Sequence, residues 1–508
     1  MAGAYKTPGV YIDEKNAFPN SVVEVATAVP AFIGYTEAAD NKGSSLAGKP
    51  WRITSMQEFV SCYGGPPEDR FEFVKNADAT TPSDFKSAGS GYVLRRKNGQ
   101  PDTFRYYLHH CMLLFFQNGG GVCYVVSVGN YTDAGAQVKP LQDGIDLLLT
   151  EREPTLVVIP DAMALPQADC IPLQQHALRH CGSQMKNRLA ILDVSDGYRE
   201  RTDPQGDCVA AFRDGLGTDF LDYSAAYYPW LNTSIVQDTD LGLASFVDVA
   251  ELKALLLAEA GGSAAPKALQ DILAQIGNAA RDPKGKTGPS DAELHKALLS
   301  VSPTYASILQ AIQRKLNLLP PAAAMAGLYT MVDNTRGVWK APANISLNSV
   351  VSPAVAITQD VQEDLNTPST GKSVNAIRSF LGEGVLVWGA RTLDGNSLDW
   401  RYINVRRTVL MIEESLSLAT KAYVFEPNVA TTWITIKSMA SNFLTGIWKR
   451  GGLAGATPAD AFNVFVGLGE TMTADDILEG VMRVTVLVAL SRPAEFIELS
   501  FQQQMQKS

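Results

Sequence analysis

The stretch GGGVCYVV, residues 119–126, predicts a strand that follows a glycine-rich turn. Two apolar runs of similar length come after it, TLVVI at 155–159 and RLAILDV at 188–194. The segments between these runs have helical patterns. Strands that alternate with helices are typical of α/β domains. We therefore expect an α/β domain between roughly residues 110 and 235.

The C-terminal part of the chain has sharper patterns. GVLVW at 384–388 predicts a strand, and apolar residues spaced along one helix face predict helices over about 404–420 and 431–449. Residues 422–426 are expected to form a short strand that a proline ends, and residues 481–490 a longer strand. The fold class expected for the whole chain is therefore α/β within an α+β multidomain arrangement.

The composition narrows the classes of function. Among 508 residues, 46% are hydrophobic and 19% are charged, which excludes a chain that is disordered as a whole. The net charge of −10 opposes binding to phosphate backbones, so no nucleic-acid partner is expected. No window reaches the ~18 uncharged apolar residues of a transmembrane helix, so no direct membrane insertion is expected. The 6 cysteines lack paired spacing, which predicts reduced and mostly buried thiols.

Motif searches give no catalytic, cofactor-binding or metal-binding residues. HALRH at 176–180 has two histidines on one helix face but lacks the glutamate of a zincin motif. GKT at 285–287 and GKS at 371–373 both lack the upstream glycine of a Walker A loop. The G-x-S-x-G elbow is also missing around Ser195. We therefore expect no enzyme activity, no cofactor and no metal.

Both ends of the chain contain short segments in which apolar and polar residues alternate as in a strand. These residues are Val10, Tyr11, Ile12, Asp13 and Glu14 near the N-terminus, and Glu495, Phe496, Ile497, Glu498, Leu499 and Phe501 near the C-terminus. Such segments promote aggregation unless they pair with a designated sheet edge. They either add as strands to a neighbouring copy of the chain or pair within their own chain, and the pattern alone leaves both alternatives open.

Several longer motifs resemble those of one known family. The N-terminal motifs are KTPGVYIDEK at 6–15 and VPAFIGYTE at 29–37. The C-terminal motifs are VNAIRSFLGEGVLVWGARTLD at 374–394, WRYINVRRTVLMIEESL at 400–416, YVFEPN at 423–428, FLTGIWKRGGLAGATPADAFNV at 443–464, TMTADDILEGVMRVTVLVAL at 471–490 and SRPAEFIELSF at 491–501. In order and spacing they resemble the sheath subunits of contractile phage tails, R-type pyocins and related injection particles. The resemblance is dense over 374–501, present over 5–37 and loose in the middle.

The resemblance implies a mechanism of assembly. Sheath subunits stack as six-fold rings in a helix around a rigid inner tube, and the terminal arms add strands to the sheets of adjacent subunits. Carried onto this chain, Val10 to Glu14 and Glu495 to Phe501 are the donor strands, and the linker near Asn16 to Ser21 is where the connections flex. On triggering, the sheath shortens and widens and drives the tube through a target envelope. The implied partners are other copies of the chain, the inner tube protein, and the baseplate and terminal cap proteins.

The resemblance also implies a division of the chain. The expected parts are an N-terminal extended arm at 1–35, outer variable material at 36–345, a conserved inner sheath domain at 346–490 and a C-terminal arm at 491–508. The inner domain is expected to combine a mixed β-sheet with flanking helices. The outer material is expected to form an α/β domain with a loop-rich insertion near 66–106 and a helical insertion near 240–320.

One helix is a candidate for contact with the inner tube. The resemblance implies a charged helix of the inner domain, and the helix over 431–450 carries Lys437, Lys449 and Arg450. The alternative is that these are solvated charges, since Lys449 and Arg450 also suit the negative end of the helix dipole.

The sequence is compatible with three kinds of protein. The compact start GAYKTPGVYIDE favours a phage-like contractile injection system, with a tail sheath of a contractile-tailed phage or prophage as the alternative. A soluble α/β enzyme with extended termini is the alternative from another class. For the sheath we expect assembly in the bacterial cytoplasm and a place in a virion or a phage tail-like particle that is released from the cell.

Overall fold

The computed structural model describes residues 22–76, 82–96, 105–132, 134–276 and 289–499. The chain forms two compact units. The larger unit is Ala26–Arg407, and the C-terminal unit combines Met1–Val25 with Thr408–Ser508. This division differs from the expected one, because the boundary falls at 407/408 instead of 345/346 and residues 26–35 belong to the larger unit.

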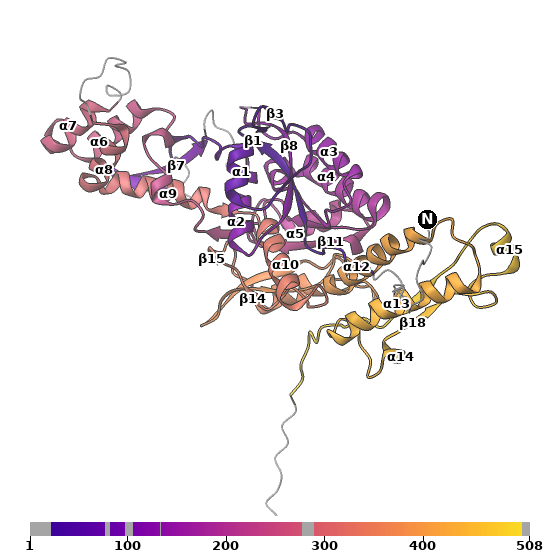
Figure 1. Cartoon of the computed structure of the whole chain (residues 1–508). Coiled ribbons are helices and arrows are strands. Elements are labelled where there is room, and N and C mark those ends of the chain that lie inside the picture. Colours follow the sequence, from indigo (N-terminus) through magenta and orange to yellow (C-terminus); the bar gives the residue numbers. More distant parts are fainter. Residues whose placement is uncertain (1–21, 77–81, 97–104, 133, 277–288, 500–508) are drawn as a thin grey trace, which may run out of the picture. The chain divides into compact units, whose positions relative to one another are not determined.

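A nine-stranded sheet is the centre of the larger unit (Figure 1). In spatial order its strands are β14 (Ile345–Ser346), β17 (Gly384–Trp388), β16 (Asn375–Phe380), β11 (Ser224–Tyr228), β10 (Leu189–Asp193), β9 (Leu156–Val158), β1 (Pro30–Thr36), β8 (Cys123–Asn130) and β4 (Trp51–Ile53). The strands from β16 to β8 pair in parallel, whereas β4, β17 and β14 pair antiparallel at the two edges. The expected strands at 122–126, 155–159, 188–194 and 384–388 are confirmed.

The parallel strands have a doubly wound order. Along the chain they run β1, β8, β9, β10, β11, but in space β1 lies between β8 and β9. The chain therefore reverses its winding direction between β1 and β9, which is a topological switch point. Strand β1 is buried along all 7 residues, and this explains its continuous apolar sequence PAFIGYT.

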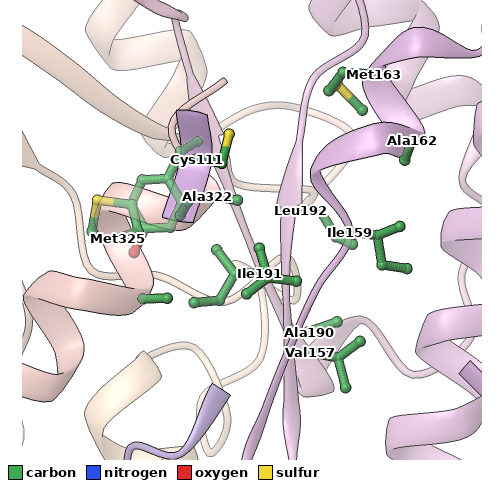
Figure 2. Close-up of a cluster of buried hydrophobic side chains, with 14 of the residues drawn as sticks. Cys111, Val157, Ile159, Ala162, Met163, Ala190, Ile191, Leu192, Ala322 and Met325 are labelled. Carbon is green, nitrogen blue, oxygen red and sulfur yellow. The ribbon is translucent and has the colours of Figure 1, made fainter. Parts of the chain in front are cut away.

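Helices cover both faces of this sheet. Helix α2 (Leu108–Gln117) packs against α10 (Ala322–Arg336) and β1, whereas α3 (Val138–Asp146) packs against α4 (Gln167–Arg179) and β8. Figure 2 shows Cys111 of α2 and Met325 of α10 on one side of the strands and Met163 on the other. The helical patterns expected between the strands at 122–126, 155–159 and 188–194 correspond to α3 and α4.

Two insertions that lie far apart in the sequence form one second hydrophobic core in the larger unit. The first contributes the sheet β5 (Phe71–Lys75), β7 (Ser90–Arg96) and β6 (Phe85–Ser87). The second contributes α6 (Val249–Glu259), α7 (Lys267–Gln275), α8 (Asp291–Val301) and α9 (Pro303–Leu316). The ring of Phe73 lies 5.6 Å from that of Phe246, so the two segments pack directly together. We call this part the insertion subdomain.

Smaller elements complete the larger unit. A three-stranded sheet combines β13 (Leu318–Leu319), β12 (Leu231–Thr233) and β15 (Val350–Pro353). The others are α1 (Met56–Tyr63), α5 (Cys208–Gly215), α11 (Gln359–Asn366), β2 (Asp40–Asn41) and β3 (Ser44–Ser45).

The C-terminal unit is built on two long helices. Helix α12 (Ile403–Thr420) crosses the boundary between the units, and α13 (Ala430–Lys449) packs against α14 (Pro458–Ala461) and β18 (Phe462–Phe465). Strand β18 pairs antiparallel with β19 (Thr485–Val488), and the short helix α15 (Ala474–Leu478) precedes β19. The backbone N–H of Val25 donates to Ser415 Oγ at 3.1 Å, so the N-terminal segment lies along α12.

The helices expected over 404–420 and 431–449 are confirmed, but the strands of this unit differ from those expected, and β18 was not predicted. The strand over 422–426 was wrong: residues 421–423 form a 3-10 turn and Phe425 has a φ of +70°, which a strand does not allow. The strand over 481–490 shortens to Thr485–Val488. Val424 and Leu487, which lie in these two apolar runs, are largely exposed.

Two further features concern membranes and thiols. No helix within the described ranges combines the length and the apolar content that a membrane span requires. All six cysteines are free thiols, and five of them are buried, as the sequence predicted.

Candidate functional site

The C-terminal arm exposes its apolar side chains. Residues 491–499 form no strand, and Phe496, Ile497 and Leu499 are 77%, 78% and 73% exposed. The alternation of Glu495 to Leu499 is thus not used for pairing within the described part of this chain. Its companion residues Val10, Tyr11, Ile12, Asp13 and Glu14, together with Phe501, lie outside the described residues.

A small sheet with open edges lies in the same unit. Phe462 pairs with Val488 and Phe465 with Thr485, and among residues 408–499 neither strand has a second ladder partner. Helix α13 covers one face, where Phe462 and Val464 are buried. A two-stranded sheet is marginally stable by itself, and its free edges offer backbone N–H and C=O groups to a further strand.

A wide groove with exposed apolar side chains lies near this sheet. Its volume is about 950 Å3, and its lining includes Val424, Phe425, Ile436, Met482 and Val484. Phe425 is fully exposed, which is unusual for an aromatic side chain without a partner. Exposed apolar patches of this kind mark sites of interaction with other proteins. Sequence reasoning missed this surface because it assigned Phe425 to a short strand.

The structure separates the three candidate tube-contacting cations. Lys437 lies on α13, with its Nζ 3.7 Å from Glu470 Oε1, about three turns before Lys449 and Arg450 at the end of the helix. Arg450 pairs with Glu24 of the N-terminal segment and donates from Nε to the carbonyl of Gly446 at 3.3 Å. Lys449 is exposed in the last helical turn. The three side chains therefore do not form one cluster.

The chain passes between the two units twice, at 25/26 and at 407/408. One buried ion pair in the larger unit binds the residues close to both of these points. The guanidinium of Arg407 donates to Asp333 Oδ1 at 3.0 Å, to Asp333 Oδ2 at 2.6 Å and to the carbonyl of Thr27 at 3.0 Å. Thr27 Oγ1 donates to the same carboxylate, and the side chains of Arg407 and Asp333 are each only 3% exposed. Thr27 is the second residue of the larger unit after the first crossing and Arg407 is its last residue before the second, so this ion pair holds the chain at both crossings. We call it the crossing clamp.

Buried acids in the larger unit have structural roles. Asp161 accepts from the backbone N–H groups of Tyr35, Tyr107 and Leu108 at 2.7, 2.6 and 3.1 Å. Burial raises the pKa of Asp161 to about 6 in spite of these hydrogen bonds. A Cβ on Gly34 would lie 2.5 Å from Asp161 Oδ2, so the close approach of β1 requires glycine. Among the described residues no group of three or more His, Cys, Asp or Glu side chains is arranged to hold a metal ion.

Replacement of Asp193 by asparagine is expected to flatten the pH dependence of stability. Burial raises the pKa of Asp193 to about 7, and its Oδ1 accepts from the N–H of Ala322 at 2.7 Å. A carboxyl whose folded pKa is raised stabilises the fold below its unfolded pKa of about 4 and loses this contribution as pH rises to about 7. Between about pH 5 and pH 8 the unfolding free energy of the wild type should fall by about 2–3 kcal/mol more than that of Asp193→Asn.

This prediction is checked by urea denaturation of both proteins at each pH. The comparison cancels the opposing contribution of His109, His110 and His180, whose pKa values burial lowers to about 4, 3 and 4. Parallel pH profiles of the wild type and the variant would contradict the prediction.

The sequence is similar to known proteins. Residues 396–504 match the family described as the phage tail sheath C-terminal domain. The tail sheath protein of Vibrio phage KVP40 is 26% identical over 189 residues, which are 35% of this chain and 28% of that protein. This chain therefore matches less than a third of the length of that curated relative.

Two solved structures match along nearly the whole chain. A chain of the anti-feeding prophage (AFP) baseplate in its contracted state is 26% identical with a TM-score of 0.63, over 98% of this chain and 99% of that one. A chain of an extracellular contractile injection system, the PVC sheath complex in its contracted state, is 25% identical with a TM-score of 0.58, over 99% and 98%.

Proposed function

We propose that this chain, which belongs to the contractile tail sheath protein family, is the subunit of a six-fold helical sheath that surrounds an inner tube and contracts to drive it through a target envelope. The observation that carries this proposal is the whole-chain similarity to proteins of contracted injection particles. The resemblance seen in the sequence and the match of residues 396–504 point to the same family.

Within this family, we favour a phage-like contractile injection system. The similarity to the two injection-particle chains spans both units, whereas the phage relative shares only part of its length. The alternative is the tail sheath of a contractile-tailed phage or prophage. The proposed role is structural, with no enzymatic step.

The proposed assembly joins subunits through their arms. Val10 to Glu14 of one subunit and Glu495 to Phe501 of another add as strands to the open edges of β18 and β19 in a third. The exposed apolar residues of the C-terminal arm and the unpaired strand edges support this pairing. The C-terminal unit then forms the inner layer of the sheath and the larger unit the outer layer. A contact surface that does not close on itself generates a helical filament.

Contraction is proposed to exchange one set of contacts between subunits for another while the arms stay paired. Packed interfaces of this kind have discrete alternative arrangements, so the extended sheath stores free energy that contraction releases. The further proposed partners are the inner tube, the baseplate and the terminal cap. We propose assembly in the bacterial cytoplasm and a place in a particle that is released from the cell.

Electron microscopy of the purified full chain tests the proposed function. Expressed alone or with its tube protein, the chain should form tubes with regular transverse striation, and image averaging should show six-fold symmetry. A monodisperse monomer under all assembly conditions, including the presence of the tube protein, would overturn the sheath assignment.

Charge reversal at the end of α13 is expected to weaken assembly on the tube. Lys449→Glu with Arg450→Glu should reduce the yield of sheathed tubes about tenfold or more in co-sedimentation, and the defect should grow as salt is lowered. Because Arg450 also pairs with Glu24, a variant with the added change Glu24→Arg restores that pair and isolates the contact with the tube. Unchanged co-sedimentation of this swapped variant would remove both residues from the tube interface.

A further inference from the structure

A small cleft lies at the carboxyl edge of the doubly wound sheet. Its volume is about 250 Å3, and on the side of the sheet it is lined by Arg105, Tyr107, Tyr198 and Trp230. Tyr198 follows β10 and Trp230 follows β11, so both come from loops that leave the carboxyl ends of parallel strands. In open doubly wound sheets this edge is where ligands bind.

Aromatic rings form one wall of the cleft. The ring centroid of Trp230 lies 5.7 Å from that of Tyr107 and 5.3 Å from that of Tyr198, both in edge-on geometry. The indole N–H of Trp230 donates to the carbonyl of Val194 at 2.9 Å, which fixes the orientation of the ring. Tyr198 is half-buried, whereas Tyr107 and Trp230 are almost fully buried. The wall is therefore rigid and apolar, with an edge that solvent reaches.

The insertion subdomain supplies much of the opposite wall. Phe71 and Arg96 come from β5 and β7, Lys315 comes from the end of α9, and Leu318 follows it. The cleft thus lies where the two hydrophobic cores of the larger unit meet. A molecule bound here would contact both cores.

One buried cation in the cleft, Arg105, forms no ion pair with a carboxylate within the described part of the chain. Arg96 pairs with Asp69, and Lys315 pairs with Asp84 at 3.3 Å. Arg105 instead donates to the backbone carbonyls of Lys315 and Leu316 at 3.1 and 3.0 Å, and its Nε has no hydrogen-bond partner among the described residues.

The charge of Arg105 is costly in this position. Arg105 as a whole residue is 5% exposed, and its guanidinium carbon lies 4.7 Å from the ring centroid of Tyr107. Burial lowers the pKa of Arg105 despite the nearby charge of Asp69. A buried cation in this state gains free energy from a further anion.

We propose that this cleft binds a small planar aromatic acid, with its ring against the half-buried Tyr198 and its carboxylate beside the guanidinium of Arg105. The volume lies just below the range of about 300–1,000 Å3 that drug-sized ligands occupy, so the ligand has a single ring system. Guanidinium and carboxylate form strong charge-assisted hydrogen bonds, and the rings supply the apolar contact. This inference is independent of the proposed sheath function.

Binding of 4-hydroxybenzoate to the full chain tests the proposal. Isothermal titration calorimetry should give saturable binding in the millimolar range or tighter. Two probes serve as comparisons: 4-hydroxybenzyl alcohol has the ring without the charge, and inorganic phosphate has the charge without the ring. The affinity for each should be lower than that for 4-hydroxybenzoate by about tenfold or more. Phosphate binding as tight as that of the aromatic acid would overturn the assignment of an aromatic ligand.

Two variants and a matched control locate the site. Arg105→Gln should weaken 4-hydroxybenzoate binding about tenfold or more and leave binding of the alcohol unchanged. Because Arg105 also holds two backbone carbonyls, Leu318→Phe provides a second variant, which fills the cleft with all charges in place and should abolish binding of every probe. Arg95→Gln changes an exposed arginine next to Arg96 on β7 and should leave binding as in the wild type. No saturable binding by the wild type, or undiminished binding by Leu318→Phe, would overturn the proposal.

Discussion

Replacement of Asp333 by alanine is expected to lower the unfolding free energy of the larger unit by about 3–5 kcal/mol, because it leaves a buried guanidinium without its carboxylate. The guanidinium of Arg407 donates to both carboxylate oxygens of Asp333 and lies 4.7 Å from the ring centroid of Tyr329, deep in the unit. After the substitution only the carbonyl of Thr27 still accepts from this guanidinium among the contacts described above. Urea denaturation of the full chain, followed by circular dichroism, measures the loss.

An exposed ion pair provides the control for this measurement. Lys139 and Asp143 pair one turn apart on α3, with side chains 76% and 55% exposed. Asp143→Ala should therefore change the unfolding free energy by less than about 0.5 kcal/mol. Equal losses for Asp333→Ala and Asp143→Ala would show that the crossing clamp does not stabilise the fold. The double change of Asp333 to leucine and Arg407 to methionine should recover much of the loss, since it removes the unpaired charge.

Deletion of residues 1–15 is expected to abolish polymerisation and to leave a soluble subunit. The deleted segment contains the proposed donor strand Val10 to Glu14, whereas the described core of the larger unit begins only at Val29. Main-chain hydrogen bonds supply much of the affinity in strand addition, and a sheath repeats this contact at every subunit. Negative-stain microscopy should show no striated tubes, and size-exclusion chromatography should give one subunit-sized peak with an unchanged circular dichroism spectrum.

A point substitution in the C-terminal arm tests strand addition without shortening the chain. Ile497→Pro removes a backbone N–H and blocks a strand, whereas Ile497→Ala removes only side-chain contacts. The proline variant should resemble the deletion, and the alanine variant should still polymerise, with lower stability. Normal sheaths from the variant that lacks residues 1–15 would sink the strand-exchange proposal.

Local periodicity predicted the long elements of this fold well. The helices over 404–420 and 431–449 and the strands near 122–126, 155–159, 188–194 and 384–388 each carry their signal within a few consecutive residues. The family resemblance assigned residues 1–35 to an arm, although Pro30–Thr36 is β1 in the middle of the large sheet. Its partners begin at residues 123 and 156, so the sequence around β1 holds no trace of them.

Packing between distant segments explains the other differences. The insertions near 66–106 and 240–320 were predicted as separate features, and contacts made only in the folded chain, such as that of Phe73 with Phe246, show that they share a core. The candidate surfaces also differ in whether local sequence could predict them. The C-terminal arm was found from its alternation, but the groove around Phe425 and the cleft around Arg105 depend on residues that meet only after folding.

The crossing clamp also has a mechanical consequence. Tension applied through the C-terminal unit reaches the larger unit along two covalent paths, at residues 26 and 407, and both paths end at the same buried pair. The load is then shared between Thr27 and Arg407 before it reaches Pro30, where β1 begins. A pull that would otherwise extract the central strand from its sheet must first separate two charges in the protein interior. The large sheet is thereby shielded from force that enters through either crossing.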